Sequence, residues 1–234
     1  MNYEPIPTSY RRPVAARSDS GVAAFLYSTY RWMALGLALT GVTAWFVANT
    51  PAAASLVLGN RIVLYGLLFA ELGLVMSLGA MAPRLSAVAA GGMFLGYSFL
   101  NGLTLSTLFF AYTRASLAQA FFVTAASFAA LSVYGSTTKR DLAPVGQFMF
   151  VGLIGLVIAS LVNLFFHSPA VYWVSTYAGV LIFAGLTAYD NQRLRHMYFA
   201  TGGAGNLAIN GALQLYLDFV NMFLFVLRLF GDRR

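Results

Sequence analysis

The sequence predicts an all-α membrane protein built as a bundle of seven transmembrane helices. The chain has 234 residues, of which 59% are hydrophobic and only 9% are charged. Soluble domains carry about 25% charged residues, so this composition excludes a soluble globular protein. The apolar residues also fall into seven runs of about 20 residues, the length that a helix needs to cross the hydrocarbon layer.

The chain opens with a polar, proline-containing and basic stretch, which we expect to form a short cytoplasmic arm over residues 1–24. This stretch lacks the apolar core of a signal peptide. Residues 25–234 then form one seven-helix transmembrane domain. The predicted spans, in order, are 30–50, 61–82, 86–111, 115–136, 145–166, 170–190 and 206–229.

The charges predict how the bundle is oriented. There are 14 Lys and Arg against 7 Asp and Glu, and cytoplasmic loops of membrane proteins carry the excess of basic residues. Nine basic residues fall on the side of the N-terminal arm and five on the other side. We expect a multi-pass protein of the cell inner membrane, with a cytoplasmic N-terminus, an outside C-terminus and no nucleic-acid partner. The absence of cysteine excludes disulfides and thiolate sites.

Three of the seven acids lie inside predicted spans: Glu71, Asp190 and Asp218. An Asp at a helix centre costs about 2.5–3.5 kcal/mol on insertion scales, so such residues face the bundle interior or a water-filled cavity. Asp190 and Asp218 lie 14 residues on either side of residue 204, inside a Gly-rich turn. If the sixth helix continues through residues 191–198, both acids lie at one depth, about 21 Å from the turn.

Polar residues accompany the two aspartates. Asn210, Gln214 and Asn221 share a helical face with Asp218, and we expect this stripe to line the interior. Two neighbouring carboxylates at low dielectric cannot easily both ionise, so the pair should titrate as a unit. Ionised, Asp190 and Asp218 would attract a hard cation such as Ca²⁺. We therefore expect a pH-sensitive latch and a candidate Ca²⁺ site; the alternative is that each Asp bonds a nearby Arg or hydroxyl and only joins helices.

Other charged residues are candidate partners of these acids. Arg84, Arg193 and Arg195 lie on the inner side and can neutralise the aspartates, and Arg84 and Arg193 are the candidate latch residues. Arg228 has the length to reach inward to Glu71, so we expect an ion pair between them. The alternative is two separate groups that snorkel or stay hydrated.

Four stretches resemble the Bax inhibitor family, also called transmembrane Bax-inhibitor-motif proteins. They are residues 101–104 (NGLT), 134–142 (YGSTTKRDL), 187–195 (TAYDNQRLR) and 211–231 (GALQLYLDFVNMFLFVLRLFG). The resemblance, to bacterial members, covers nearly the whole chain after residue 25. It implies a seven-helix fold with the last helix central.

The same resemblance implies a pH-sensitive Ca²⁺ leak. In it, Asp190 and Asp218 act as the sensing pair, an arginine of the second-helix region, here Arg84, is the latch, and Glu71 and Arg228 match a charged pair.

The leading hypothesis is therefore a pH-sensitive calcium or cation leak channel, not an enzyme, in which deprotonation of the aspartate pair loosens a closed bundle. Its partners are the lipid bilayer, protons and Ca²⁺ as the transported ion, with no cofactor. Three alternatives stay open: a non-conducting interaction or stress-regulatory protein that binds other membrane proteins, a cation/proton exchanger, and an intramembrane aspartyl protease. The protease would have Gly-x-Gly before its second aspartate, whereas Leu215-Tyr216-Leu217 precedes Asp218 here.

Overall fold

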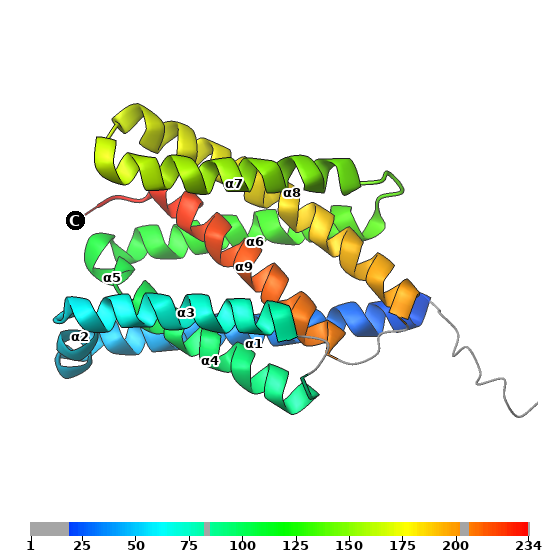
Figure 1. The fold of residues 1–234 in the computed structure, drawn as a ribbon, viewed down its shortest axis with the longest axis horizontal. Coiled ribbons are helices and arrows are strands. Elements are labelled where there is room, and N and C mark those ends of the chain that lie inside the picture. Colours follow the sequence, from blue (N-terminus) through cyan, green and yellow to red (C-terminus); the bar gives the residue numbers. More distant parts are fainter. Residues whose placement is uncertain (1–18, 82–84, 202–205, 234) are drawn as a thin grey trace, which may run out of the picture.

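The computed structural model describes residues 19–81, 85–201 and 206–233 (Figure 1). Within these ranges the chain is helical apart from short connections. The helices are α1 (Asp19–Asn49), α2 (Pro51–Leu58), α3 (Arg61–Met81), α4 (Ala87–Leu105), α5 (Leu108–Ala111), α6 (Arg114–Thr137), α7 (Ala143–Phe166), α8 (Pro169–Thr201) and α9 (Leu207–Phe230). In the described part, seven helical segments are long and apolar enough to cross a membrane, which confirms the predicted number.

Local sequence signals set several helix boundaries. Pro occupies the first turn of α2 and of α7, where its fixed φ suits a helix start and its missing N–H is not needed. The Ser86 hydroxyl caps α4 by accepting the Ala89 N–H at 3.1 Å, and Thr113 caps α6 by accepting the Ser116 N–H at 3.2 Å. The spans are helical because backbone polar groups inside a bilayer must find hydrogen-bond partners within the chain.

The first two elements differ from the prediction. α1 begins at Asp19, inside the stretch 1–24 that we assigned to the arm, while residues 1–18 lie outside the described part. The connection between the first two spans contains α2, because Pro51 follows Thr50 at a position that starts a helix.

The third span is interrupted between α4 and α5. The hydroxyls of Ser106 and Thr107 donate to the carbonyls of Leu103 and Thr104 at 2.6 and 2.9 Å. Such local side-chain bonds compete with a regular helix. The predicted span over residues 86–111 is confirmed as one apolar span, although its helix is interrupted at this point.

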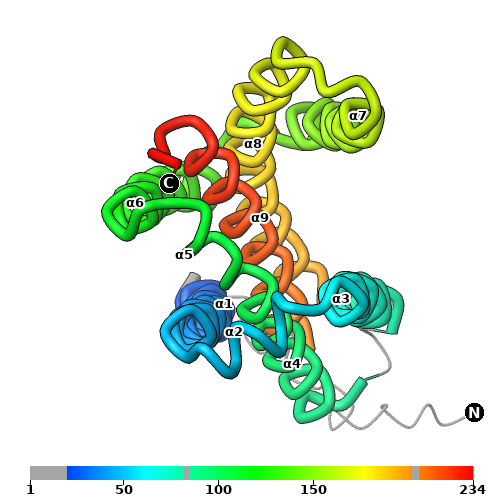
Figure 2. Tube along the Cα trace, turned by 90° about the vertical axis from the view of Figure 1, so that its left-hand side faces the viewer, coloured from blue at the N-terminus to red at the C-terminus, as the bar shows by residue number. Residues whose placement is uncertain are grey.

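α9 lies at the centre of the bundle. It packs against α1, α4, α6 and α8 and crosses the middle of the molecule between them (Figures 1 and 2). Over an 18-residue apolar stretch of α9, 56% is buried, whereas the corresponding share is 33% or less in every other span of the described part. α3 packs mainly on α4, and α7 mainly on α8, so both lie at the outside. The predicted central last helix is confirmed.

We name the two ends of the bundle after an arginine at each. The Arg193 end, on the right in Figure 1, holds the start of α1 and the end of α8; it is the side predicted to be cytoplasmic. The Arg114 end holds the start of α6 and the C-terminus. Between the ends, large apolar side chains are exposed, such as Phe148 (73%) and Phe165 (83%) on α7. An exposed apolar belt of this kind is expected of a surface that faces lipid.

Candidate functional site

Asp190 of α8 and Asp218 of α9 meet in the interior of the bundle. Each is only 4% exposed, and their side chains lie close enough to influence each other. A hydrogen bond between two carboxyl groups needs a proton on one of them, because an ionised carboxylate only accepts. α8 continues through residues 191–198, as the equal-depth prediction required. The two acids therefore face each other across the α8–α9 contact.

Two further features complete the surroundings of this aspartate pair. Gln214, one turn before Asp218 on α9, lies beside Asp190. Oδ2 of Asp218 is buried and has no hydrogen-bond partner among the described residues. A buried acceptor without a donor costs about 1–3 kcal/mol. A proton or a cation at this oxygen would remove that cost.

Asn191, the next residue on α8, was missed at the sequence level. It is fully buried. Its Oδ1 accepts a 2.5 Å hydrogen bond from the Tyr30 hydroxyl of α1, and its Nδ2 donates to Ser132 Oγ of α6 at 3.1 Å. Asn191 therefore joins three helices beside the aspartate pair.

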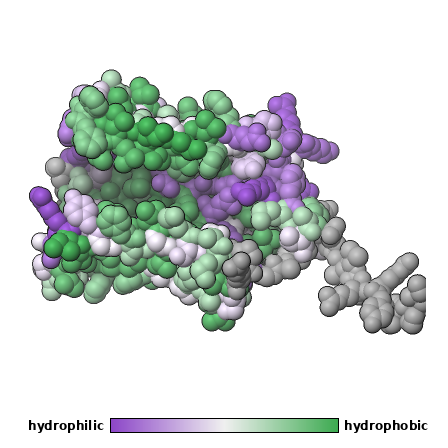
Figure 3. Space-filling view, viewed as in Figure 1, coloured by the Kyte–Doolittle hydropathy of each residue, from purple (hydrophilic) through white to green (hydrophobic). Residues whose placement is uncertain are grey.

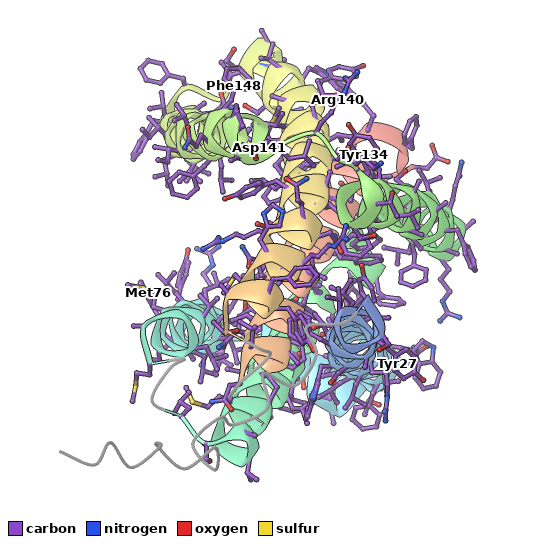
Figure 4. All side chains as sticks on the ribbon, turned by 90° about the vertical axis from the view of Figure 1, so that its right-hand side faces the viewer. Tyr27, Met76, Tyr134, Arg140, Asp141 and Phe148 are labelled. Atoms are coloured by element: carbon purple, nitrogen blue, oxygen red, sulfur yellow. The ribbon has the colours of Figure 1, made fainter. Side chains whose placement is uncertain are left out.

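Gln192, which was also missed, fastens the loop between α6 and α7 to α8. Its Oε1 accepts the Leu142 N–H at 2.8 Å, and its Nε2 donates to the Arg140 carbonyl at 2.7 Å. Figure 4 shows Arg140 and Asp141 in this loop, beside α8 at the Arg193 end. The sequence did carry a signal: successive helical residues point about 100° apart, so the run Asp-Asn-Gln cannot share one face and must find three neighbours.

Two cavities lie on either side of the depth of the aspartate pair, and neither of them is lined by Asp190 or Asp218. One, of about 280 Å³, is lined at the Arg193 end by Asp141, Tyr189 and Arg193, among others. The other, of about 270 Å³, is lined by Phe183 of α8, Asn221 of α9 and residues of α7. Because α8 and α9 are antiparallel, both helices place the pair between the two cavities. Figure 3 shows a hollowed face with hydrophilic residues gathered toward the Arg193 end.

The structure describes only one of the two arginines that we predicted as latch residues. Arg84 lies outside the described residues. Arg193 is exposed and lies at the rim of the first cavity, near enough for its charge to act on Asp190. Asp190 itself faces Asp218 and Gln214 of α9. Arg193 therefore lies beside the aspartate pair but does not act as its latch in this structure.

The predicted polar stripe of α9 is half-buried and touches the aspartate pair at one position, Gln214. Asn221 donates to the Leu217 carbonyl of its own helix at 2.8 Å and lines the second cavity. Asn210 lies in the first turn of α9, distant in sequence from the pair. The stripe therefore faces the interior, as expected, but only Gln214 belongs to the site.

Glu71 finds its partners on α4. Its carboxylate accepts hydrogen bonds from the Thr104 hydroxyl and from the Asn101 amide, the latter at 3.2 Å. Arg228 is exposed, with its guanidinium carbon 5.3 Å from the ring centroid of Phe225. The expected Glu71–Arg228 ion pair is not formed between these described residues. The reason is that α3 packs on α4, which brings neutral donors to the middle of α3.

The polar site around Glu71 continues into the bundle. The Tyr216 hydroxyl donates to Asn101 Oδ1 at 3.1 Å and lies 2.7 Å from Thr40 Oγ1. Thr40 in turn donates to the Ser98 carbonyl at 2.8 Å. This chain of hydrogen bonds links α3, α4, α9 and α1 and is a second polar centre, separate from the aspartate pair.

Comparison with known proteins adds independent information. The family model described as inhibitor of apoptosis-promoting Bax1 matches residues 22–234. Inner membrane protein YbhL of Escherichia coli K12 is 49% identical over 229 residues, which cover 93% of this chain and 98% of that protein. An uncharacterised protein of Deinococcus radiodurans is 46% identical over 216 residues, 91% of this chain and 92% of that one. An uncharacterised membrane protein of Streptococcus pyogenes serotype M1 is 38% identical over 222 residues, 93% and 96% of the two chains.

Proposed function

Because the chain belongs to the Bax inhibitor family, we propose that it is a pH-sensitive leak pathway for Ca²⁺, held closed by the protonated pair Asp190 and Asp218. The observation that carries the proposal is the place of this pair. Two buried acids lie between a cavity at the Arg193 end and a cavity toward the Arg114 end. Intramembrane acids are costly and mark ion or proton pathways.

The proposed gate works by loss of one proton. With a proton on one carboxyl, Asp190 and Asp218 are bonded and α8 stays packed on α9. When pH rises and this proton leaves, two like charges face each other. At about 4 Å and an effective dielectric constant of about 20, their repulsion is about 4 kcal/mol. That energy is enough to shift a closed–open equilibrium about a hundredfold or more.

The same groups favour passage of Ca²⁺ over its retention. Ca²⁺ takes six to eight oxygen ligands, and the pair with Gln214 supplies fewer. The described residues contain no group of three or more His, Cys, Asp or Glu side chains that could hold a metal ion. A weak site of two carboxylates attracts a hard cation and also releases it.

The proposal includes a place in the cell. One relative is named an inner membrane protein, and we propose the same membrane for this chain. Because basic residues are in excess on the side of the Arg193 end, we propose that this end faces the cytoplasm. Protons of the cytoplasm would then reach the aspartate pair through the cavity lined by Asp141 and Arg193.

The proposal is tested by Ca²⁺ flux into liposomes that hold the purified full-length protein, at pH 6, 7 and 8. We expect flux to rise with pH in the wild type. The double variant Asp190→Asn, Asp218→Asn keeps a neutral, hydrogen-bonded pair and so mimics the protonated state; its flux should stay low at every pH.

The matched control is Asp232→Asn, which removes an acid at the exposed C-terminal end and should keep the wild-type pH profile. Wild-type flux in the double Asn variant, with its rise from pH 6 to pH 8 intact, would refute the role of the pair. A flux that requires an opposing proton gradient would instead indicate a cation/proton exchanger. Zero flux in the folded wild type would favour the non-conducting interaction protein.

A further inference from the structure

A third cavity, away from the aspartate pair, lies between α1 and α6 near the Arg114 end. Its volume is about 340 Å³, within the range of about 300–1,000 Å³ that ligand pockets occupy. Phe219, Val220 and Phe223 of α9 form its floor, and Leu108 and Phe109 of α5 close its end. Figure 2, which looks from the Arg114 end, shows α5 crossing between α4 and α6 with α1 below it.

The cavity opens toward the lipid between two small residues. Gly41 of α1 and Ala118 of α6 both line it and both are exposed. A Cβ added at Gly41 would meet no atom within 4 Å, so the space in front of this backbone is free. On α6 the lining runs from Arg114 to Phe122, which corresponds to about 12 Å of depth at 1.5 Å per residue.

Arg114 is the charged residue in a lining that is apolar apart from it and Thr40. It is the first residue of α6 and is exposed, at the depth where a membrane helix begins. Its Nη2 donates to Asn49 Oδ1, at the end of α1, at 2.8 Å. This partner is neutral, so the bond does not compensate the positive charge. Trp45, exposed one turn before Asn49, is the residue type that marks the membrane interface.

We propose that this cavity binds an anionic membrane phospholipid, with one acyl chain between α1 and α6 and its phosphate on Arg114. The depth, the apolar walls and the lipid-facing opening fit an acyl chain. The guanidinium at the interfacial end fits a phosphate, to which Arg can donate two hydrogen bonds. This site is independent of the proposed Ca²⁺ pathway.

The two parts of the site contribute differently. An acyl chain gains little by leaving other lipid tails, because these are as apolar as the cavity walls. The contacts of the acyl chain with the cavity walls therefore do not discriminate between lipid headgroups. Selectivity comes from Arg114, since a basic residue near an anionic headgroup contributes about 1 kcal/mol, equivalent to about a fivefold preference.

The test is native mass spectrometry of the detergent-purified full-length protein, titrated with phosphatidylglycerol or with phosphatidylcholine of identical chains. We expect about fivefold stronger retention of phosphatidylglycerol by the wild type. Arg114→Gln should remove this preference by lowering the retention of phosphatidylglycerol more than that of phosphatidylcholine. Gly41→Leu places a side chain in the opening and should reduce retention of both lipids.

Two substitutions serve as matched controls. Arg61→Gln removes an exposed arginine at the same end that does not line the cavity, and Gly66→Leu fills open space on α3 in the same way. Both should bind lipid like the wild type. Equal headgroup preference in Arg114→Gln and wild type would overturn the proposal. So would a protein dimer that Gly41→Leu dissolves, because it would assign the cavity to a second copy of the chain.

Discussion

At the scale of single residues, the consecutive side chains of Asp190, Asn191 and Gln192 contact different elements and have different roles. Each points to a different part of the bundle: Asp190 to Asp218 and Gln214 on α9, Asn191 to α1 and α6, and Gln192 to the loop before α7. The aspartate is the candidate titrating group. The two amides hold α8 in place around it, so the position of Asp190 depends on residues that carry no charge.

The importance of Asn191 can be measured with Asn191→Leu. The substitution leaves the Tyr30 and Ser132 hydroxyls without this partner, and hydrogen bonds between membrane helices contribute about 0.6–2 kcal/mol. We expect a loss of about 1–2 kcal/mol in thermal unfolding of the detergent-solubilised protein. Asn221→Leu is the control, because Asn221 bonds only its own helix; a loss as large there would contradict the assignment.

The three intramembrane acids show what residue-level reasoning can reach. The free-energy cost of placing an acid inside the membrane was enough to identify Glu71, Asp190 and Asp218 as interior groups. The equal spacing of the two aspartates from a turn predicted that they meet. Spacing could not identify the partners of Glu71. Thr104 and Asn101 donate to Glu71 only because α3 packs on α4. The local sequence around Glu71 does not indicate which helix packs against it.

At the scale of elements, the close contact of α6 with α8 positions the site. A Cβ at Gly135 would lie 2.1 Å from the carbonyl oxygen of Ala188, two residues before Asp190. Only a residue without a side chain allows the two backbones to approach this closely. The helix that carries the candidate gate is therefore fixed on one side by α9 and on the other by α6.

Gly135→Ala tests this contact. Because the obstacle is backbone, the helices must separate, and we expect a stability loss of about 1–3 kcal/mol, the usual cost of overpacking. Gly155→Ala on α7, where an added Cβ meets no atom within 4 Å, should be neutral or stabilising by up to about 1 kcal/mol. Similar thermal unfolding of both variants would show that α6 and α8 can move apart freely.

At the scale of the whole molecule, α3 and α7 are the outer helices and α9 is the centre. Figure 4 shows Met76 on α3 and Phe148 on α7 on the same side of the bundle, across the hollow from each other. α3 is joined mainly to α4 and α7 mainly to α8. A loosening of α8 from α9 should therefore carry α7 away from α3.

This motion can be followed with spin labels, because the chain has no cysteine of its own. Met76→Cys and Phe148→Cys place labels at positions that are 64% and 73% exposed. As pH rises from 6 to 8 and the proton leaves the aspartate pair, we expect the distance between the labels to increase by about 2–5 Å, the scale of helix shifts in switching proteins.

The label distance should stay constant in the background Asp190→Asn, Asp218→Asn. A second label pair on one helix, Phe148→Cys with Leu161→Cys on α7, controls for effects of pH on the labels themselves. The same increase in the Asn background would assign the motion to other titrating groups.

By itself, the sequence determined the fold class, the number of spans and the short list of interior acids. These follow from length and polarity, because a bilayer accepts only apolar helices of a set length and makes every buried charge costly. Only the tertiary structure decided which groups meet: Gln214 with Asp190, Asn101 and Thr104 with Glu71, and Asn191 with two helices. The partner of a polar side chain depends on which helices pack together and on their rotation, and both are set by contacts between segments far apart in the chain.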